Sequence, residues 1–535
     1  MGPFRTRVPW RGDAGLGERE HSLKGFKRNN AAFTPSEETA AVISADAPHV
    51  TTSQLGSFPI ALFLLLLLVI ASSPWYWGGN RPLALLSLEL LAVAIVWLTL
   101  AFDSGERGSS LVRKTAWALL ALPGAYLIPL PLDSFSVLPG RDIYGDVLHA
   151  LNSSTEWRSL SVYAFATESA WLALLPPIAV FLGLLKLPTH YLRMLTVALV
   201  VTAVAQAMLG LIQYGDGPQS WFRFGNLNYT HSAVGTFANR NHLANMLAVS
   251  LPLATAFLVA AWWRRRVSTG GRHTIGGGAH AVHLAWWTFA LLLLLLGLLF
   301  TGSRAGILVG LFGLVISLLL LARRVGRDGL LGWVGGVSVA AAALATVIGL
   351  GPILARFSSV DPLTDVRWTV FGSVVQAIGE FFPIGSGPGT FADVYPRFQP
   401  LALNYFVNHA HNDYLEWTVE LGFLAVLAIL WILSLYLYRW LKLWQTRDGN
   451  ETMLLQMGAG VAALVMALHS ALDFNFHIPA NAIYFAACLA LFFHSGPVNR
   501  QLPPQRRSYG PRAEEPKPPI ASSAAGSVPN PFLSD

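Results

Sequence analysis

Residues 57–73 read SFPIALFLLLLLVIASS, an apolar run without a single charged side chain. Such a run suits a membrane-spanning helix, which needs roughly 20 apolar residues because hydrocarbon offers no partner for backbone polar groups. The whole chain extends this pattern: 53% of its residues are hydrophobic and only 12% are charged, about half the charged share of an average soluble domain. The sequence therefore predicts an all-α polytopic membrane protein.

The apolar runs between polar breaks predict about twelve membrane-spanning helices. The third and fourth are the least regular, because their prolines remove backbone hydrogen bonds. Two polar segments, 132–168 and 353–420, are predicted to be long external loops, the second of them between the ninth and tenth helices. The predicted spans are 57–73, 82–101, 115–131, 169–185, 191–213, 243–263, 283–300, 305–322, 331–352, 421–438, 453–472 and 479–495.

The distribution of positive charge predicts the orientation of these helices. If the N-terminus lies in the cytoplasm, the inner segments hold three quarters of the 36 lysines and arginines. This is the positive-inside pattern, and it accounts for the net charge of +7 without nucleic acid as a partner. Both termini are then cytoplasmic and both long loops lie outside.

The two ends of the chain differ from the apolar part between them. Residues 1–56 are polar and basic, and residues 496–535 are rich in proline, serine and charge. Neither can bury enough apolar surface to fold, so both are predicted to be disordered cytoplasmic tails. Residues 57–495 are left as the transmembrane domain.

Residues 408–416 read NHAHNDYLE and concentrate polar side chains in one external stretch. His409, His411 and Asp413 match the start of the H-x-H-x-D-H pattern of metallo-β-lactamase-type hydrolases, although a tyrosine stands where the last histidine belongs. Asp413 and Glu416 also have the spacing of a capping box and would begin a helix. The stretch is therefore open to a metal-binding and to a structural interpretation.

A catalytic role for His411 follows from the same geometry. If a helix begins at Asp413, His411 lies just before its N-terminus, where the positive end of the helix dipole disfavours an imidazolium. A neutral imidazole accepts a proton near pH 7, so His411 would serve as a general base for a hydroxyl acceptor at the outer membrane face.

Two further stretches place polar side chains where outer turns meet apolar helices. Arg304, in TGSRAG, lies between two apolar runs, a costly place for a charge without a partner. Its guanidinium would reach lipid phosphate or bind the anionic group of a membrane-held ligand. Arg240, Asn241 and His242, in GTFANRNHLA, mark the outer start of another span and would act as interfacial anchors or as substrate-binding residues.

Two remaining stretches carry weaker signals. In HSALDFNFHIPANA, His469 and Asp473 are four residues apart and so lie on one helical face, where they would hydrogen-bond each other or contact substrate. In PIGSGPGTF, at 383–391, the glycines and prolines indicate turns, because the Gly-Lys-Ser/Thr of a phosphate-binding loop is missing.

Taken together, these stretches resemble the O-antigen ligase and polymerase family. The motifs that carry the likeness occur in the family's order: GTFANRNHLA, TGSRAG, Arg367 with Trp368 ahead of PIGSGPGTF, and AHNDYLEWTVELG. The resemblance covers roughly residues 170–495. It implies a GT-C-type glycosyltransferase in a bacterial inner membrane that needs neither a metal ion nor another cofactor.

The family resemblance also implies the reaction and its partners. Family members take a glycan from undecaprenyl pyrophosphate and pass it to an acceptor hydroxyl at the periplasmic face. Ligases use lipid A core, polymerases use another lipid-linked repeat unit, and related O-oligosaccharyltransferases use a protein. The acceptor stays open here, and a flippase or other transporter of the lipid-linked glycan is the alternative from another functional class.

The family pattern assigns roles to individual residues of this chain. It implies that His411 is the catalytic base and that Arg304, Arg367 and Arg240 bind the pyrophosphate. Asn241, His242 and Asn412 complete the predicted substrate-binding set. The predicted supporting residues are His409, Asp413, Glu416, His469 and Asp473.

Overall fold

The computed structural model describes most of the chain between residues 57 and 495. The two predicted tails, 1–56 and 496–535, lie outside the described residues, and so does part of the predicted loop 353–420. Within 57–495 the segments outside the description are 102–107, 152–155, 227, 269–277, 326–329, 349–350, 352–365 and 447–449.

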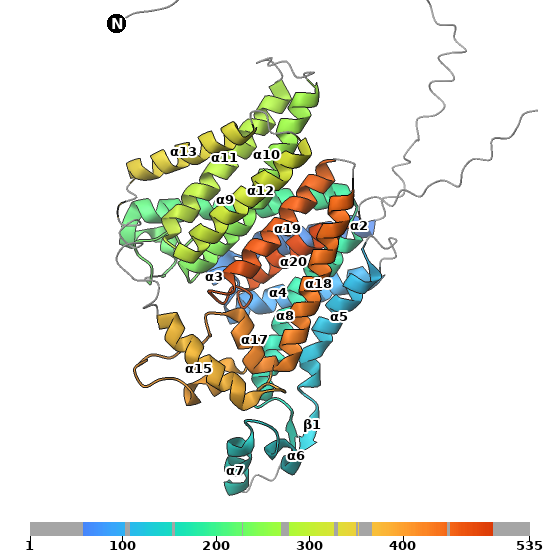
Figure 1. Cartoon of the computed structure of the whole chain (residues 1–535), viewed down its shortest axis with the longest axis vertical. Helices are drawn as coiled ribbons and strands as arrows, with labels where there is room; N and C mark the ends of the chain where they lie inside the picture. Colours follow the sequence, from blue (N-terminus) through green and yellow to red (C-terminus); the bar gives the residue numbers. More distant parts are fainter. Residues whose placement is uncertain are drawn as a thin grey trace, which may run out of the picture. The chain divides into compact units, whose positions relative to one another are not determined.

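A helix occupies each of the twelve segments predicted to span the membrane (Figure 1). These helices are α2 (Ser57–Ser72), α4 (Pro82–Ala101), α5 (Ser110–Ala125), α8 (Ala164–Lys186), α9 (Thr189–Asp216), α10 (Arg240–Ser268), α11 (Gly278–Thr301), α12 (Arg304–Val325), α13 (Leu330–Ile348), α18 (Phe423–Gln445), α19 (Glu451–His469) and α20 (Pro479–Phe493).

Among the described residues, eight helices are long and apolar enough to cross a membrane, namely α4, α8, α9, α10, α11, α12, α18 and α19. Shorter apolar helices lie at Phe58–Ser72, Gly332–Leu344 and Pro479–Phe493. The prolines within α8 do not end that helix, which runs through Pro176 and Pro177. The structure is thus that of a polytopic membrane protein, and the count of twelve spans stays a prediction.

Helix α10 is the centre of the helix packing. Every residue of its most apolar stretch is buried, and the helix packs against α9, α11, α12 and α19. In the corresponding stretch of α18, only 6% of the residues are buried inside the protein. An apolar helix with so little protein contact presents its surface to lipid. The start of α10, with Arg240 and Asn241, is therefore fixed by the interior of the helix bundle.

The predicted external loop 353–420 is folded where the structure describes it. Four short helices form there: α15 (Val366–Phe381), α16 (Phe391–Val394), η5 (Tyr395–Arg397) and α17 (Asp413–Leu421). They enclose a hydrophobic cluster separate from that of the helix bundle, with Val370, Phe381, Tyr395 and Val419 among its buried members. Residues 408–412, which lead into α17, are thereby held by a folded support rather than by an open loop.

The other segment predicted to be external adds the only strands found in the described residues. Strand β1 (Pro129–Pro131) pairs antiparallel with β2 (Trp157–Ser159), next to α6 (Leu132–Ser136) and α7 (Asp142–Ala150). The remaining short elements are α3 (Trp75–Gly78), η2 (Gly217–Gln219) and η3 (Trp221–Arg223). The all-α prediction holds apart from this one short pair of strands.

Arg141 joins the two segments predicted to be external. Its guanidinium is fully buried and donates to the carbonyl oxygen of Leu160, at 2.7 Å from Nη2 and 3.0 Å from Nε, and to the carbonyl of Gly385 at 2.7 Å. A buried cation requires such partners. Burial lowers the pKa of Arg141 to about 10, so the side chain stays charged at neutral pH.

PIGSGPGTF at 383–391 forms turns, as its glycines and prolines predict. It wraps the end of α17, where Ser386 and Gly387 donate backbone N–H groups to Val419 and Glu420. Gly422, between α17 and α18, has φ of +58°, and a Cβ there would collide with the carbonyl of Pro383. Only glycine fits this position, which fixes the direction of α17 and hence of the residues before it.

Candidate active site

Two segments far apart in sequence meet at the start of α17. The backbone N–H of Asp413 donates to the carbonyl of Ser470 at 3.0 Å, and the N–H of Phe476 donates to Asp413 Oδ2 at 3.1 Å. The loop 470–478, between α19 and α20, therefore lies directly against residues 408–413.

His411 and Asp473 form a hydrogen-bonded pair across this junction. His411 Nδ1 lies 3.2 Å from Asp473 Oδ1, and the histidine side chain is 33% exposed whereas the aspartate side chain is 1% exposed. His411 has φ of +53°, in the left-handed region that costs a non-glycine residue about 1–2 kcal/mol. Such backbone conformations cluster at functional sites.

Asp473 is the hub of the site, because side chains from three other segments converge on its carboxylate. Asn241, from the start of α10, donates its Nδ2 at 2.7 Å, and the Arg367 guanidinium, from α15, lies 3.4 Å away. Burial by itself would raise the pKa of Asp473, but the hydrogen bond with His411 and nearby positive charge outweigh it, so the pKa lies well below its usual value.

The ionised Asp473 determines which ring nitrogen of His411 carries the proton. A carboxylate can only accept hydrogen bonds, so Nδ1 of His411 must be the donor in this pair. In the neutral ring Nε2 then holds the free lone pair. This is the tautomer in which a histidine can take a proton from a substrate while a carboxylate orients it.

Asn412 caps helix α17. Its Oδ1 accepts from the backbone N–H groups of Tyr414 and Leu415, at 3.0 and 3.1 Å. The helix begins at Asp413 as predicted, but the assignment of Asp413 and Glu416 as its capping box is wrong. Both carboxylates are buried and bind histidines instead.

These carboxylates form a second histidine network beside the first. His477 Nδ1 lies 2.7 Å from Asp413 Oδ1, and its Nε2 lies 3.3 Å from Glu416 Oε1. His409 Nδ1 lies 2.8 Å from the same Glu416 oxygen, and the backbone N–H of Ala410 donates to the other oxygen at 2.7 Å. His409 thus has a structural partner that its sequence position does not reveal.

Burial and neighbouring charges shift the pKa values of His477, Glu416 and Glu420 in and beside this second network. Burial opposes an imidazolium at His477, but Glu416 and Asp413 outweigh burial and raise its pKa to about 10. Burial likewise opposes ionisation of Glu416, yet His477 and His409 bring its pKa below the usual value. Burial and the charge of Glu416 raise the pKa of Glu420 to about 8. A charged His477 paired with a carboxylate is therefore the neutral-pH state.

One group in the described chain has the composition of a metal site. The ligand atoms of His409, Glu416 and His477 lie within 4.8 Å of one another. His411 and Asp413 turn to Asp473 and His477, so the three residues of the H-x-H-x-D spacing do not share one centre. Glu416 Oε1 hydrogen-bonds with His409 Nδ1 at 2.8 Å and lies 3.3 Å from His477 Nε2, and these two contacts explain why the three residues lie close together.

Three of the other predicted residues, Arg240, Arg304 and His469, lie at helix ends. Arg240 begins α10 and its Nη1 lies 3.3 Å from Ser232 Oγ, while Arg304 begins α12. Gly306, one turn into α12, lies close against His469 at the end of α19. The structure thus brings Asn241, Arg367 and His411 onto Asp473, and it places Arg240 and Arg304 on neighbouring helix starts.

His469 and His242 are both buried, and His469 does not make the contact that its spacing to Asp473 predicts. His469 Nδ1 lies 3.2 Å from Asn245 Oδ1, so the predicted hydrogen bond between His469 and Asp473 is wrong. Asp473 lies beyond the end of α19, where the helical spacing no longer applies. His242 packs edge-on against Phe474, with ring centroids 4.8 Å apart.

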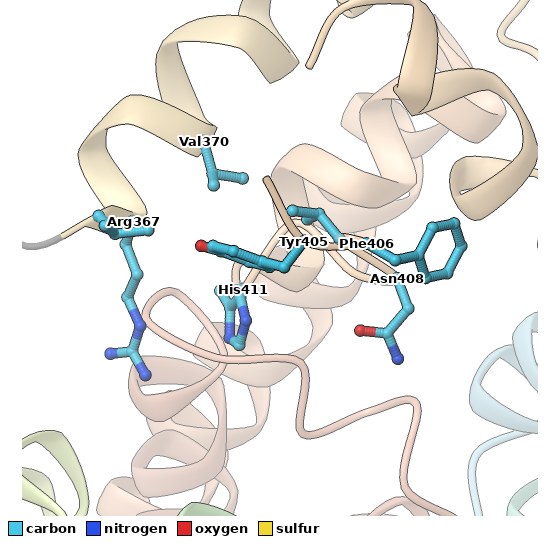
Figure 2. A pocket seen from close by; sticks show the side chains of 8 residues that line it. Arg367, Val370, Tyr405, Phe406, Asn408 and His411 are labelled. Carbon is cyan, nitrogen blue, oxygen red and sulfur yellow. The ribbon is translucent and has the colours of Figure 1, made fainter. Parts of the chain in front are cut away.

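Arg367 and His411 line a common pocket of about 210 Å³. Figure 2 shows the Arg367 side chain running from the start of α15 beside the His411 ring, with Tyr405 lying above that ring. The other described lining residues are Val366, Val370, Phe406, Val407 and Asn408. A cation and a histidine with a free ring nitrogen therefore face one ligand-sized space.

Sequence reasoning missed His477 and Arg141. The signal for His477 was its place in HSALDFNFHIPANA beside Asp473, but its partners lie more than sixty residues away, at Asp413 and Glu416. Arg141 is one of two arginines in a segment predicted to be external, and its sequence position gave no indication of full burial.

Comparison with known families agrees with the motifs. Residues 289–430 match the family model Wzy_C, described as O-Antigen ligase. This range includes Arg304, Arg367 and His411 and ends before Asp473. No curated protein matches the chain. The match confirms the resemblance to the O-antigen ligase and polymerase family over residues 289–430.

Proposed function

We propose that the protein transfers a glycan from undecaprenyl pyrophosphate to an acceptor hydroxyl at the periplasmic face of a bacterial inner membrane. One observation carries the proposal: His411 and Arg367 line the same pocket and meet on the same buried carboxylate, Asp473. A base and a phosphate-binding cation are the two groups that this displacement needs.

In the proposed reaction His411 Nε2 removes the proton of the acceptor hydroxyl. The oxygen then attacks the anomeric carbon, and the bond between that carbon and the pyrophosphate oxygen breaks. Arg367, with Arg304 and Arg240, stabilises the charge that develops on the departing pyrophosphate. An in-line attack inverts the anomeric configuration.

The remaining predicted residues hold these groups in position. Asn241 and Arg367 hold Asp473, which orients His411. Asn412 caps α17, and His242 packs against Phe474 next to Asp473. Every step uses protein side chains, so we propose that transfer does not require a metal ion.

The proposed topology has twelve spans, cytoplasmic termini and a periplasmic site. It is supported by the excess of lysine and arginine in the predicted inner segments and by the helix found in each predicted span. The site lies among the starts of α10, α12 and α15 and the end of α19, rather than halfway along broken helices as in many transporters. This arrangement favours the enzyme over a flippase.

The test is transfer by the full chain in liposomes that contain an undecaprenyl-pyrophosphate-linked glycan. Lipid A core, a second lipid-linked repeat unit and a protein with exposed hydroxyls are supplied as acceptors in separate reactions, each with and without EDTA. We expect one acceptor to become glycosylated, at the same rate in EDTA. Movement of the donor between leaflets without transfer to any acceptor would support the transporter instead.

A further inference from the structure

The pocket has an aromatic wall that the proposed reaction leaves unused. Tyr405 is 50% exposed although it is a large side chain, and it belongs to the segment 400–408 that leads to His411. In Figure 2 its ring lies above His411 and its hydroxyl is directed towards Arg367, whereas Phe406 points to the opposite side. Tyr405 is therefore the aromatic group next to both reactive residues.

The composition of the pocket suits a sugar ring. Val366, Val370 and Val407 contribute apolar surface, and Asn408 and Arg367 contribute hydrogen-bonding groups. A pyranose has the same division, with a face of C–H groups and a rim of hydroxyls. Aromatic faces carry negative charge density and attract the slightly positive C–H groups.

The size of the pocket limits how much of a glycan it holds. Its volume of about 210 Å³ is below the roughly 300–1,000 Å³ typical of pockets for drug-sized ligands. A single ring fits better than a chain of rings. In the proposed reaction only one ring must lie between Arg367 and His411, because the pyrophosphate leaves from the carbon that the acceptor attacks.

We propose that Tyr405, with Val370 beside it, forms a subsite that stacks on the sugar directly attached to the donor pyrophosphate. This assignment rests on the proposed function. The described lining residues include one permanent cation, Arg367, and no carboxylate, so the subsite also tolerates the adjacent pyrophosphate. The stacked ring would present its anomeric carbon between the leaving group and His411.

The test compares two lipids in detergent solution: undecaprenyl pyrophosphate alone, and the same lipid with one monosaccharide attached. We expect Tyr405→Ala to weaken binding of the monosaccharide-bearing lipid by about 2- to 12-fold, the range for an aromatic contact. Binding of the bare lipid should not change. Tyr405→Phe, which keeps the ring, should bind both lipids within twofold of the unaltered protein.

The matched control is Tyr438→Ala, which removes a tyrosine of similar exposure from α18. If the unaltered protein does not distinguish the two lipids, or if Tyr405→Ala weakens both equally, the subsite is wrong and Tyr405 acts as a membrane anchor. Failure of the unaltered protein to bind either lipid would instead overturn the proposed function. Tyr405→Leu removes the ring with less change of volume and decides the matter if the alanine variant does not fold.

Discussion

Two histidine–carboxylate pairs join the same two segments of this chain, and they differ in what surrounds them. His411 with Asp473 opens onto the pocket and shares its carboxylate with Arg367 and Asn241. His477, by contrast, is enclosed between two buried carboxylates, those of Asp413 and Glu416. The chemical groups are alike, so their surroundings decide their roles.

The two pairs differ in whether the histidine keeps a ring nitrogen that no carboxylate contacts. In the pair of His411 and Asp473, one ring nitrogen remains for a substrate, because the carboxylate occupies only Nδ1. At His477 both ring nitrogens contact carboxylates, at 2.7 and 3.3 Å. The first pair can therefore transfer a proton, and the second holds the loop 470–478 against α17 so that the first can form.

The largest expected effect is that of His411→Gln on transfer. Loss of a positioned general base lowers a rate by about 10²- to 10⁴-fold. Donor binding should persist, because in the proposed reaction arginines hold the pyrophosphate. The measurement is kcat and donor affinity in the liposome assay, with His149→Gln, at an exposed histidine of α7, as the control. Full activity in His411→Gln would remove the assignment of this residue as the base.

His477→Gln should act on stability rather than on chemistry. Removing one member of a buried ion pair costs about 3–5 kcal/mol, because the carboxylates of Asp413 and Glu416 lose their cation. Thermal unfolding in detergent measures this loss, and kcat per folded molecule should stay within a fewfold of the unaltered value. Normal unfolding with abolished transfer would mean that the roles of the two pairs are exchanged.

Arg304→Lys should have an intermediate effect on transfer. Lysine keeps the charge and loses the planar fork that binds phosphate through two N–H groups. We expect kcat/KM for the lipid-linked donor to fall by about tenfold, on the order of one charged hydrogen bond. Arg323→Lys, at the other end of α12, is the matched control and should have no effect. Unchanged turnover in Arg304→Lys would show that two-point phosphate binding is not needed there.

The remaining expected effect is a gradual loss of stability with rising pH. Folding raises the pKa of His477 from 6.5 to about 10, so the stabilisation is complete below pH 6.5 and is lost as the pH approaches 10. Glu420, with its pKa raised from 4.5 to about 8, acts in the same direction at lower pH. Melting temperatures between pH 6.5 and 10 should fall less steeply in His477→Gln. Parallel curves would contradict the charged state of His477.

The sequence predicted the helices better than it predicted their contacts. Apolar runs such as 57–73 lie where helices form, because hydrogen bonding in a membrane is satisfied within each helix. The relevance of His411, Arg367 and Asp473 was also visible, since polar groups are rare in such a chain. The pairing of Asp473 with His411 was not visible in the sequence. The two residues are 62 positions apart, so their contact depends on packing that no local spacing encodes.

The helix start shows the same limit at shorter range. Capping-box spacing correctly indicated that a helix begins at Asp413 but assigned the cap to the wrong residue. Asn412 caps the helix because Asp413 and Glu416 are taken up by His477 and His409. Tertiary partners therefore overrode a local preference, and His477 went unnoticed for the same reason.

The most direct test of the central claim is a double-mutant cycle on kcat with His411→Gln, Asp473→Asn and the combination of the two. Residues that act as one unit lose their effect together, so removing the second should cost little once the first is gone. We predict that the double variant transfers glycan no more than about threefold more slowly than His411→Gln alone. Two losses that multiply would show that Asp473 does not act through His411.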